Sequence, residues 1–204
     1  MELVVVAGPN GSGKTTIITT EGLNDSDYIS LSADSISKML EAEMPDEKER
    51  ILEAWKRCEQ FREALILSGE NFVWETVFSD ARRLDVLRYA KSKGYTIRLI
   101  FVTTRSEEIN VERVSKRVQL GGHNVPEDKI RSRYKNTMRL LPEMLALSTT
   151  ARVYDNSEDN GKPLLAIVLE ENRLTLEYDA PEWAKDVFDQ MEDRYSSEFS
   201  LFRL

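Results

Sequence analysis

The chain opens with an apolar run and a glycine-rich loop, and this stretch constrains the fold more than any other. Val4, Val5 and Val6 precede residues 8–15, which read Gly-Pro-Asn-Gly-Ser-Gly-Lys-Thr. This spacing is typical of a phosphate-binding loop between a strand and a helix. The glycines allow positive φ angles, so that backbone N–H groups at the helix N-terminus can cradle phosphate oxygens. The alternative is a glycine-rich strand-to-helix turn that binds no ligand.

The two residues that end this loop predict a nucleotide and a metal ion. Lys14 supplies a cation for the β- and γ-phosphates of ATP. The Thr15 hydroxyl suits Mg²⁺, which takes few protein oxygens beside phosphate and water. We therefore expect ATP and Mg²⁺ as cofactors, with Thr15 as the metal ligand. The predicted nucleotide-binding residues are Gly8, Pro9, Asn10, Gly11, Ser12, Gly13, Lys14, Thr15, Thr16 and Asn156.

Composition sets the broad class of protein. The length of 204 residues and 41% hydrophobic content predict one globular domain with a substantial core. A net charge of −8 argues against a broad nucleic-acid-binding surface, although a local basic groove stays open. Cys58 is the single cysteine, so no intrachain disulfide forms, and we expect a cytoplasmic location and a core role for this thiol. We expect no signal peptide, membrane span or membrane partner.

Strand and helix patterns alternate through residue 154. This alternation predicts βαβ units and a parallel sheet with helices on both faces, the three-layer α/β fold of P-loop NTPases and kinases. A C-terminal β-hairpin across Glu171-Asn172 and a last helix from Pro181 follow. We expect residues 1–157 to form the core, with a lid at about 106–140, and residues 158–204 to pack on it as an extension.

Three local patterns give further expectations. Ser79 is a candidate N-cap for the helix that follows it, and Pro142 should kink or end its helix. A helix from Asp46 to Ser68 should carry an apolar stripe at helical spacing. The residues of that stripe are Ile51, Trp55, Cys58, Phe61 or Arg62, and Leu65.

Polar residues follow each predicted strand at its carboxyl end, where open α/β sheets bind ligands. Asp34 follows the second strand and is the candidate base, because phosphoryl transfer needs a carboxylate to take or orient the proton of the acceptor hydroxyl. The alternative is that Asp34 caps a helix. Glu75 and Thr76 end the third strand, near the expected Mg²⁺ or substrate. For Glu75 the alternative is an acid on the surface.

The predicted lid carries arginines on both sides of a glycine pair. Arg113 and Arg117 are four residues apart and share a helix face. Gly121-Gly122 can serve as a hinge, and Arg131 and Arg133 follow on the next helix. Such arginines could neutralise charge in a phosphoryl-transfer transition state, whereas the alternative is a solvated basic face.

The candidate site residues fall into two groups. His123, the single histidine, is expected to form hydrogen bonds in the lid rather than to bind metal or act as a base. The predicted catalytic residues are Asp34, Lys14, Arg113 and Arg117. The predicted substrate-binding residues are Asp34, Glu75, Thr76, His123 and Arg133.

Several motifs together resemble the zeta toxin family of P-loop kinases, in particular its chromosomal branch of predicted kinases. They are Gly8-Pro9-Asn10-Gly11-Ser12-Gly13-Lys14-Thr15-Thr16, Ser32-Ala33-Asp34-Ser35-Ile36, Trp74-Glu75-Thr76, Arg113-x-x-x-Arg117-Val118-x-x-Gly121-Gly122-His123-Asn124-Val125-Pro126 and Ile130-x-x-Arg133-Tyr134. The resemblance covers residues 1–157. The chain departs from the family at residues 76–79, where plasmid-type members carry Gly and Thr, and at residues 121–123, where some members carry an arginine.

The resemblance implies ATP-dependent phosphorylation of a sugar hydroxyl on UDP-N-acetylglucosamine or a related UDP-amino sugar. The acid matching Asp34 is then the general base, and the acid matching Glu75 contacts the sugar nucleotide. Lid arginines matching Arg113, with Arg117 as a second candidate, bind the ATP phosphates. A toxin role implies an antitoxin partner. Two alternatives stay open: a nucleotide-binding ATPase or regulatory module without an acceptor, and a kinase of nucleotides or nucleic-acid ends.

Overall fold

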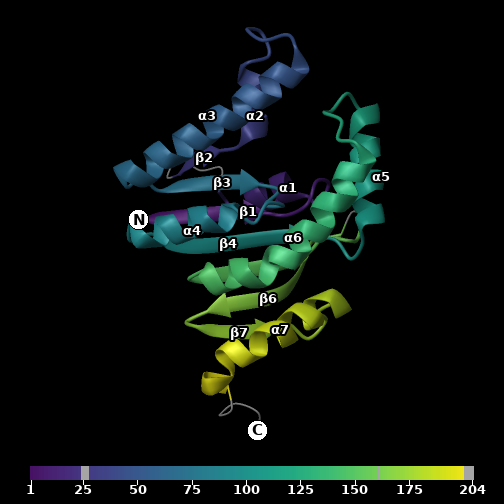
Figure 1. Ribbon diagram of the computed structural model, residues 1–204. Coiled ribbons are helices and arrows are strands. Elements are labelled where there is room, and N and C mark those ends of the chain that lie inside the picture. The colour runs from purple at the N-terminus through teal and green to yellow at the C-terminus, as the bar shows by residue number, and fades with distance from the viewer. Residues whose placement is uncertain (24–27, 160, 200–204) are drawn as a thin grey trace.

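The computed structural model describes residues 1–23, 28–159 and 161–199 (Figure 1). Within these residues, seven strands form one sheet in the order β2-β3-β1-β4-β5-β6-β7. The strands are β1 (Glu2–Ala7), β2 (Ile29–Leu31), β3 (Phe72–Thr76), β4 (Thr96–Thr103), β5 (Thr150–Asp155), β6 (Leu164–Glu170) and β7 (Arg173–Leu176). The helices are α1 (Lys14–Thr20), α2 (Ala33–Met39), α3 (Glu47–Ser68), α4 (Arg83–Ser92), α5 (Glu107–Gln119), α6 (Glu127–Leu147) and α7 (Glu182–Phe199).

Strand direction confirms the expected fold class. The strands β2, β3, β1, β4 and β5 run parallel to one another, whereas β6 pairs antiparallel with β5 and with β7, which adds a hairpin to the edge of the same sheet. Glu171 and Asn172 join the hairpin with φ angles of 50° and 60°. Two positive φ angles define a type I′ turn, whose twist matches that of the flanking strands.

Alternation along the strands divides the core between two faces of the sheet. Val4 and Val6 of β1 pack with Ile17 of α1 on one face. Val5 packs on the other face, in the larger cluster that contains residues of α3, α4, α6 and α7. The expectation of helices on both faces is therefore confirmed, although the two helical layers are unequal.

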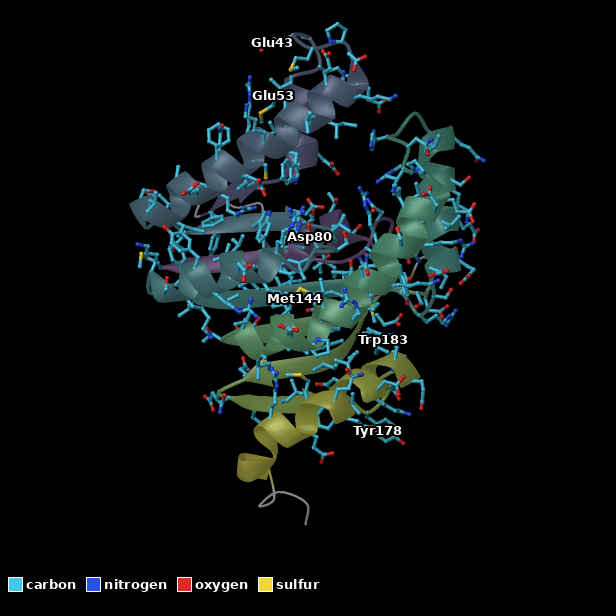
Figure 2. All side chains as sticks on the ribbon, viewed as in Figure 1. Glu43, Glu53, Asp80, Met144, Tyr178 and Trp183 are labelled. Carbon is cyan, nitrogen blue, oxygen red and sulfur yellow. The ribbon has the colours of Figure 1, made fainter. Side chains whose placement is uncertain are left out.

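Helices α5 and α6 extend beyond the sheet at the carboxyl ends of its parallel strands (Figure 1). Their outer parts pack on each other through Val114, Val125 and Ile130, a cluster separate from the sheet core. The second half of α6 returns to the sheet, where Met144 is fully buried (Figure 2). The segment expected to form a lid thus has a small apolar core of its own.

The apolar stripe expected on α3 is wrong in part. Ile51, Trp55 and Phe61 are 41%, 42% and 54% exposed, whereas Arg62, the alternative to Phe61 in the predicted stripe, is buried. The buried positions recur every four residues, at Ala54, Cys58, Arg62 and Ile66. The sequence therefore predicted the helical spacing of the buried positions correctly, but the face of α3 that packs on the sheet is rotated about the helix axis from the predicted face. Cys58 is buried, as expected.

Two predicted helix boundaries also need correction. Helix α4 starts at Arg83, so Ser79 is not its N-cap; instead the Asp80 carboxylate accepts a 3.0 Å hydrogen bond from the Arg82 N–H. Pro142 does not end α6, which continues to Leu147. An interior proline costs about 3 kcal/mol, and burial of a large apolar side chain contributes about 1.5–3 kcal/mol. Several such side chains flank Pro142: Leu140, Leu141, Met144 and Leu145.

Helix α7 packs against the C-terminal hairpin and α6. Val187 is buried, and Trp183 and Phe188 pack against the same core. The Trp183 Nε1 donates a 2.7 Å hydrogen bond to Asp155 at the end of β5 (Figure 2). The apolar face of this helix therefore meets the core of its own chain. Over the residues that the structure describes, no helix combines the length and apolar character that crossing a bilayer requires.

Candidate active site

The loop between β1 and α1 has the geometry that its glycines predict. Gly8, Gly11 and Gly13 adopt φ angles of 153°, 80° and 95°. A Cβ on Gly8 would lie 2.0 Å from the Val102 carbonyl oxygen, and one on Gly13 would lie 2.3 Å from the Asn156 Nδ2. Both conformation and space therefore require glycine at these positions.

Neighbouring elements fix the loop from outside. Asn110 of α5 donates from Nδ2 to the Asn10 carbonyl at 2.5 Å, and Asn156 donates to the Ser12 carbonyl at 2.8 Å. Arg133 of α6 donates to the Asn10 Oδ1 at 3.1 Å. In the part of the chain that the structure describes, the Ser12 hydroxyl is the buried side-chain polar atom that lacks a hydrogen-bond partner. A loop held in this preformed shape before a helix N-terminus fits a phosphate group.

Lys14 begins α1 at the base of this cradle. Its Nζ donates to the carbonyl oxygens of Gly8 and Pro9 at 3.0 and 3.1 Å. Burial lowers the pKa of Lys14, while the negative charges of Glu75 and Asp34 oppose that shift. Lys14 thus lies within electrostatic range of both predicted acids.

One cavity of about 500 Å³ brings most of the predicted site residues together. Gly8, Pro9, Ser12 and Asn156 do not line it, and Asn156 instead supports the loop through its hydrogen bond to the Ser12 carbonyl. The predicted residues that do line it are Asn10, Gly11, Gly13, Lys14, Thr15, Thr16, Asp34, Glu75, Thr76, Arg113, Arg117, His123 and Arg133.

Asp34 reaches this cavity from the first turn of α2. The N-cap of α2 is Ser32, whose Oγ accepts a 3.0 Å hydrogen bond from the Ser35 N–H. The alternative that Asp34 caps the helix is therefore wrong. Its exposed carboxylate lines the cavity together with Lys14.

Glu75 approaches Lys14 from the end of β3. Glu75 pairs in register with Val6, and it alternates with Trp74 and Thr76, so its side chain points to the opposite face of the sheet from theirs. Burial raises the pKa of Glu75, and the charge of Asp34 adds to the increase, whereas Lys14 opposes it. Glu75 is thus a half-buried carboxyl group between a cation and a second acid, not an isolated acid on the surface.

The lid arginines make different contacts. Arg113 donates to the Asn156 carbonyl at 2.5 Å and pairs with Asp159 at 3.0 Å, which ties α5 to the segment after β5. Arg117 donates to the His123 carbonyl at 2.8 Å, and the His123 Nδ1 lies 2.9 Å from the Glu47 carboxylate of α3. The segment predicted to form a lid therefore contacts the start of α3.

Arg131 takes no part in the cavity. Its guanidinium pairs with three carboxylates, at 2.8–3.0 Å, on the outer side of the lid. Those carboxylates belong to Glu107, Glu108 and Glu127. Of the cations on the second lid helix, Arg133 lines the cavity and Arg131 braces α6 against α5.

Sequence reasoning missed one side of the cavity. Trp55, Arg62, Trp74 and Arg83 line it, although the first two were expected in a stripe facing the core. An arginine within that stripe was the signal that could have revealed a polar surface there. Glu59 and Cys58 of α3 border the same side.

The turn after β3 stores backbone strain beside the cavity. Phe78 is fully buried with a φ of 54°, a conformation that costs a bulky residue about 1–3 kcal/mol. The Thr76 Oγ1 accepts a 3.3 Å hydrogen bond from the Phe78 N–H, and Thr137 donates to the Val77 carbonyl at 2.9 Å. These bonds hold the strained turn, which sets the direction of Val77 and Ser79 at the cavity wall.

The loop, the sheet order and the cavity at the strand ends define a P-loop domain of the NTPase and kinase-like α/β class. Residues 3–140 match the model of the AAA_33 family, described as an AAA domain. Because this match spans more than half of the sequence, the chain belongs to that family. The expected P-loop class is confirmed, and the zeta toxin branch stays a prediction.

Comparisons with individual proteins support the same fold. An uncharacterized protein of Haemophilus influenzae is 26% identical over 131 residues, which are 64% of this chain and 91% of that protein. The crystal structure of AvrRxo1-ORF1:-ORF2 with ATP superposes with a TM-score of 0.71 at 15% identity, over 93% of this chain. This chain spans 62% of the length of that one. The structure described for the PezAT chromosomal toxin–antitoxin system of Streptococcus pneumoniae gives 0.61 at 19% identity, over 96% and 86% of the two chains.

Proposed function

We propose that the protein is an ATP-dependent phosphotransferase that phosphorylates a hydroxyl group of a small molecule. The observation that supports this most is the single cavity lined by Lys14, Asp34 and Glu75 together with the lid arginines. A nucleotide-binding module without an acceptor has no need of an acid placed like Asp34, which enters the cavity from α2. The cavity volume of about 500 Å³ also lies within the range of small-molecule sites.

The P-loop side of the cavity would hold the donor. Backbone N–H groups of the loop and the Lys14 ammonium bind the β- and γ-phosphates of ATP. Thr15 lies in the first turn of α1 and would hold Mg²⁺, which neutralises phosphate charge when it is bound. Arg113 and Arg117 supply cations from the lid, which we place at residues 106–140, and stabilise the charge that develops during transfer. We place the catalytic unit at residues 1–157, and the described part of residues 158–204 packs on it as an extension.

Asp34 would act on the acceptor. Its carboxylate accepts the hydroxyl proton as the acceptor oxygen bonds to the γ-phosphorus, and the bond to the β-phosphate oxygen breaks to release ADP. Glu75 lies near both Lys14 and Asp34 and orients the acceptor between them. Thr76, His123 and Arg133 line the cavity and complete the proposed acceptor contacts.

A UDP-amino sugar such as UDP-N-acetylglucosamine is the acceptor that we propose to test first. The motifs around Asp34, Glu75 and Gly121-Gly122 resemble those of zeta toxins. The fold is also similar to a structure described for a toxin–antitoxin system. The test is transfer from ATP labelled at the γ-phosphate to UDP-sugars, nucleosides, free sugars and RNA ends. We expect a labelled UDP-sugar; ATP turnover that no hydroxyl compound changes would refute the phosphotransferase proposal.

A toxic role, with an antitoxin partner, is the second part of the proposal. Expression of the wild-type chain in bacteria should then stop growth, whereas expression of Asp34→Asn should not. A second exposed aspartate in a first helical turn, Asp128, provides the control Asp128→Asn. Equal growth with the wild-type chain and Asp34→Asn would remove the toxin role while leaving the transfer reaction to be judged by its own assay.

A further inference from the structure

Two arginines, Arg62 buried and Arg83 partly buried, lie on the side of the cavity that was not predicted from the sequence. The Cζ of Arg62, from α3, lies 4.6 Å from the centre of the Trp74 ring, and the Cζ of Arg83, from α4, lies 5.6 Å from it. The Arg62 side chain is only 11% exposed. Both arginines line the cavity. Two cations are therefore held beside one indole ring at the edge of the cavity.

These cations have little negative charge to balance them. Arg62 pairs with Glu59 at 3.5 Å, a long contact to a carboxylate whose side chain is 43% exposed. Arg83 donates to the Thr76 hydroxyl at 2.7 Å and forms no ion pair with any described residue. Burial, together with the charge of Arg62, lowers the pKa of Arg83. Burying cations without full pairing is costly unless an anion joins them.

The neighbouring carboxylates compensate the pair only in part, because Glu59 and Asp80 act to raise the pKa of Arg83 but burial and Arg62 together lower it. Burial raises the pKa of the Cys58 thiol, which keeps it neutral near pH 7. By contrast, Arg131 on the lid is paired with three carboxylates. The positive charge of Arg131 is thus fully paired with carboxylates, whereas the charges of Arg62 and Arg83 are not. Incomplete pairing at a cavity is typical of a binding site rather than of a structural ion pair.

The position of the pair separates it from the donor phosphates. Trp74 and Thr76, which contact the two arginines, project from one face of β3, whereas Glu75 projects from the other toward Lys14. The P-loop has Lys14 and the lid arginines for the donor. An anion at Arg62 and Arg83 therefore belongs to the acceptor half of the cavity. The half-exposed ring of Trp55 lines the same cavity and can cover an apolar part of the acceptor.

We propose that Arg62 and Arg83 form a phosphate subsite, so that the acceptor is a phosphorylated hydroxyl compound rather than a neutral sugar or nucleoside. Guanidinium groups match the geometry and charge of phosphate oxygens, and two of them suit a dianion. The assignment rests on the proposed phosphotransferase function and narrows its substrate class.

The first experiment measures binding without transfer. The protein is saturated with Mg²⁺ and a non-hydrolysable ATP analogue, which fills the P-loop, and is then titrated with inorganic phosphate by calorimetry. The wild-type chain should bind phosphate saturably, and Arg62→Gln and Arg83→Gln should each weaken binding by about tenfold, as the loss of one charge-assisted hydrogen bond predicts. The matched controls Arg57→Gln on α3 and Arg88→Gln on α4 change exposed arginines and should bind like the wild type. Absence of saturable binding in the wild-type chain overturns the proposal.

A second measurement distinguishes a binding role from a structural one. If Arg62 and Arg83 serve to bind an anion, replacing either with glutamine should keep or raise the melting temperature of the free protein. If they instead stabilise the fold, the same replacements should lower it. Acceptor pairs then identify the ligand: N-acetylglucosamine 1-phosphate with N-acetylglucosamine, and UMP with uridine. The wild-type chain should prefer the phosphorylated member of a pair, and the double variant should lose that preference. If the wild-type chain binds the phosphorylated and the unphosphorylated compound equally well, the phosphate subsite is contradicted, even if phosphoryl transfer to another hydroxyl compound is found. If it prefers the phosphorylated compound but transfers no phosphate, only the phosphotransferase proposal is refuted.

Discussion

Asn110 is the residue through which α5 holds the nucleotide loop, and its removal gives a sharp test of that coupling. Asn110 is fully buried, and its Nδ2 donates to the Asn10 carbonyl at 2.5 Å. Its Oδ1 contacts the Thr104 hydroxyl. The Asn110 backbone carbonyl also lies 2.8 Å from where a Cβ on Gly11 would be. The Asn110 side chain therefore holds the loop at Asn10, and its backbone carbonyl leaves no space for a side chain at position 11.

Asn110→Ala removes the donor to the partly buried Asn10 carbonyl and also the Oδ1 that contacts the fully buried Thr104 hydroxyl. A lost hydrogen bond costs about 0.5–1.5 kcal/mol, and an unsatisfied buried group costs about 1–3 kcal/mol. We expect a loss of roughly 2 kcal/mol, which in a domain of this size lowers the melting temperature by about 4–8 °C. ATP affinity should also fall by about tenfold, because binding must then organise the loop.

Thermal unfolding and nucleotide titration measure the two effects together. Asn71→Ala is the control, since Asn71 accepts one exposed hydrogen bond from the Glu2 N–H, far from the cavity. It should change the melting temperature by less than about 3 °C and leave ATP affinity unaltered. If Asn110→Ala behaved like Asn71→Ala in both assays, the reasoning that α5 holds the loop would be refuted.

Three further perturbations test other parts of the site. Lys14→Ala should lower ATP affinity by about 10–100-fold through the loss of charge-assisted hydrogen bonds, as measured by titration with an ATP analogue; unchanged affinity would contradict its role. The pKa of Glu75 in the folded protein lies above its unfolded value of 4.5, so the wild-type protein loses stability as the pH rises from 4.5 through the folded pKa. Glu75→Gln removes this loss and should therefore raise the melting temperature near pH 7. The gain should vanish below about pH 4, and a loss at both pH values would refute the assignment. His123→Ala removes the contact with Glu47, an exposed pair worth about 0–1 kcal/mol, so the melting temperature should change little while proteolysis at residues 117–126 accelerates; equal proteolysis would show that this contact does not hold the lid.

The sequence predicted the P-loop side of the cavity well because its constraints are local. Gly8 and Gly13 must be glycine for reasons of conformation and space, and Lys14 has a fixed place after them. Asp34 and Glu75 were found because parallel strands end on one edge, so residues distant in sequence converge there. The fold class followed from the same alternation of strands and helices.

The acceptor side could not be predicted because it depends on how α3 is rotated against the sheet. Spacing alone placed Trp55 and Arg62 on one apolar face, whereas tertiary packing exposes the first and buries the second. The direction in which Arg62 and Arg83 meet Trp74 is likewise a tertiary property. The continuation of α6 through Pro142 reflects burial around it, which outweighs a local propensity.

The most direct test of phosphoryl transfer by this cavity is the transfer rate of Asp34→Asn under saturating ATP. The variant keeps the P-loop, the lid arginines and the Ser32 cap of α2, so ATP affinity should stay within about threefold of the wild type. Loss of a general base should lower the transfer rate by about 10²–10⁴-fold. Asp128→Asn, in the first turn of α6, should transfer at the wild-type rate. A wild-type rate in Asp34→Asn would contradict the proposed base and the mechanism built on it.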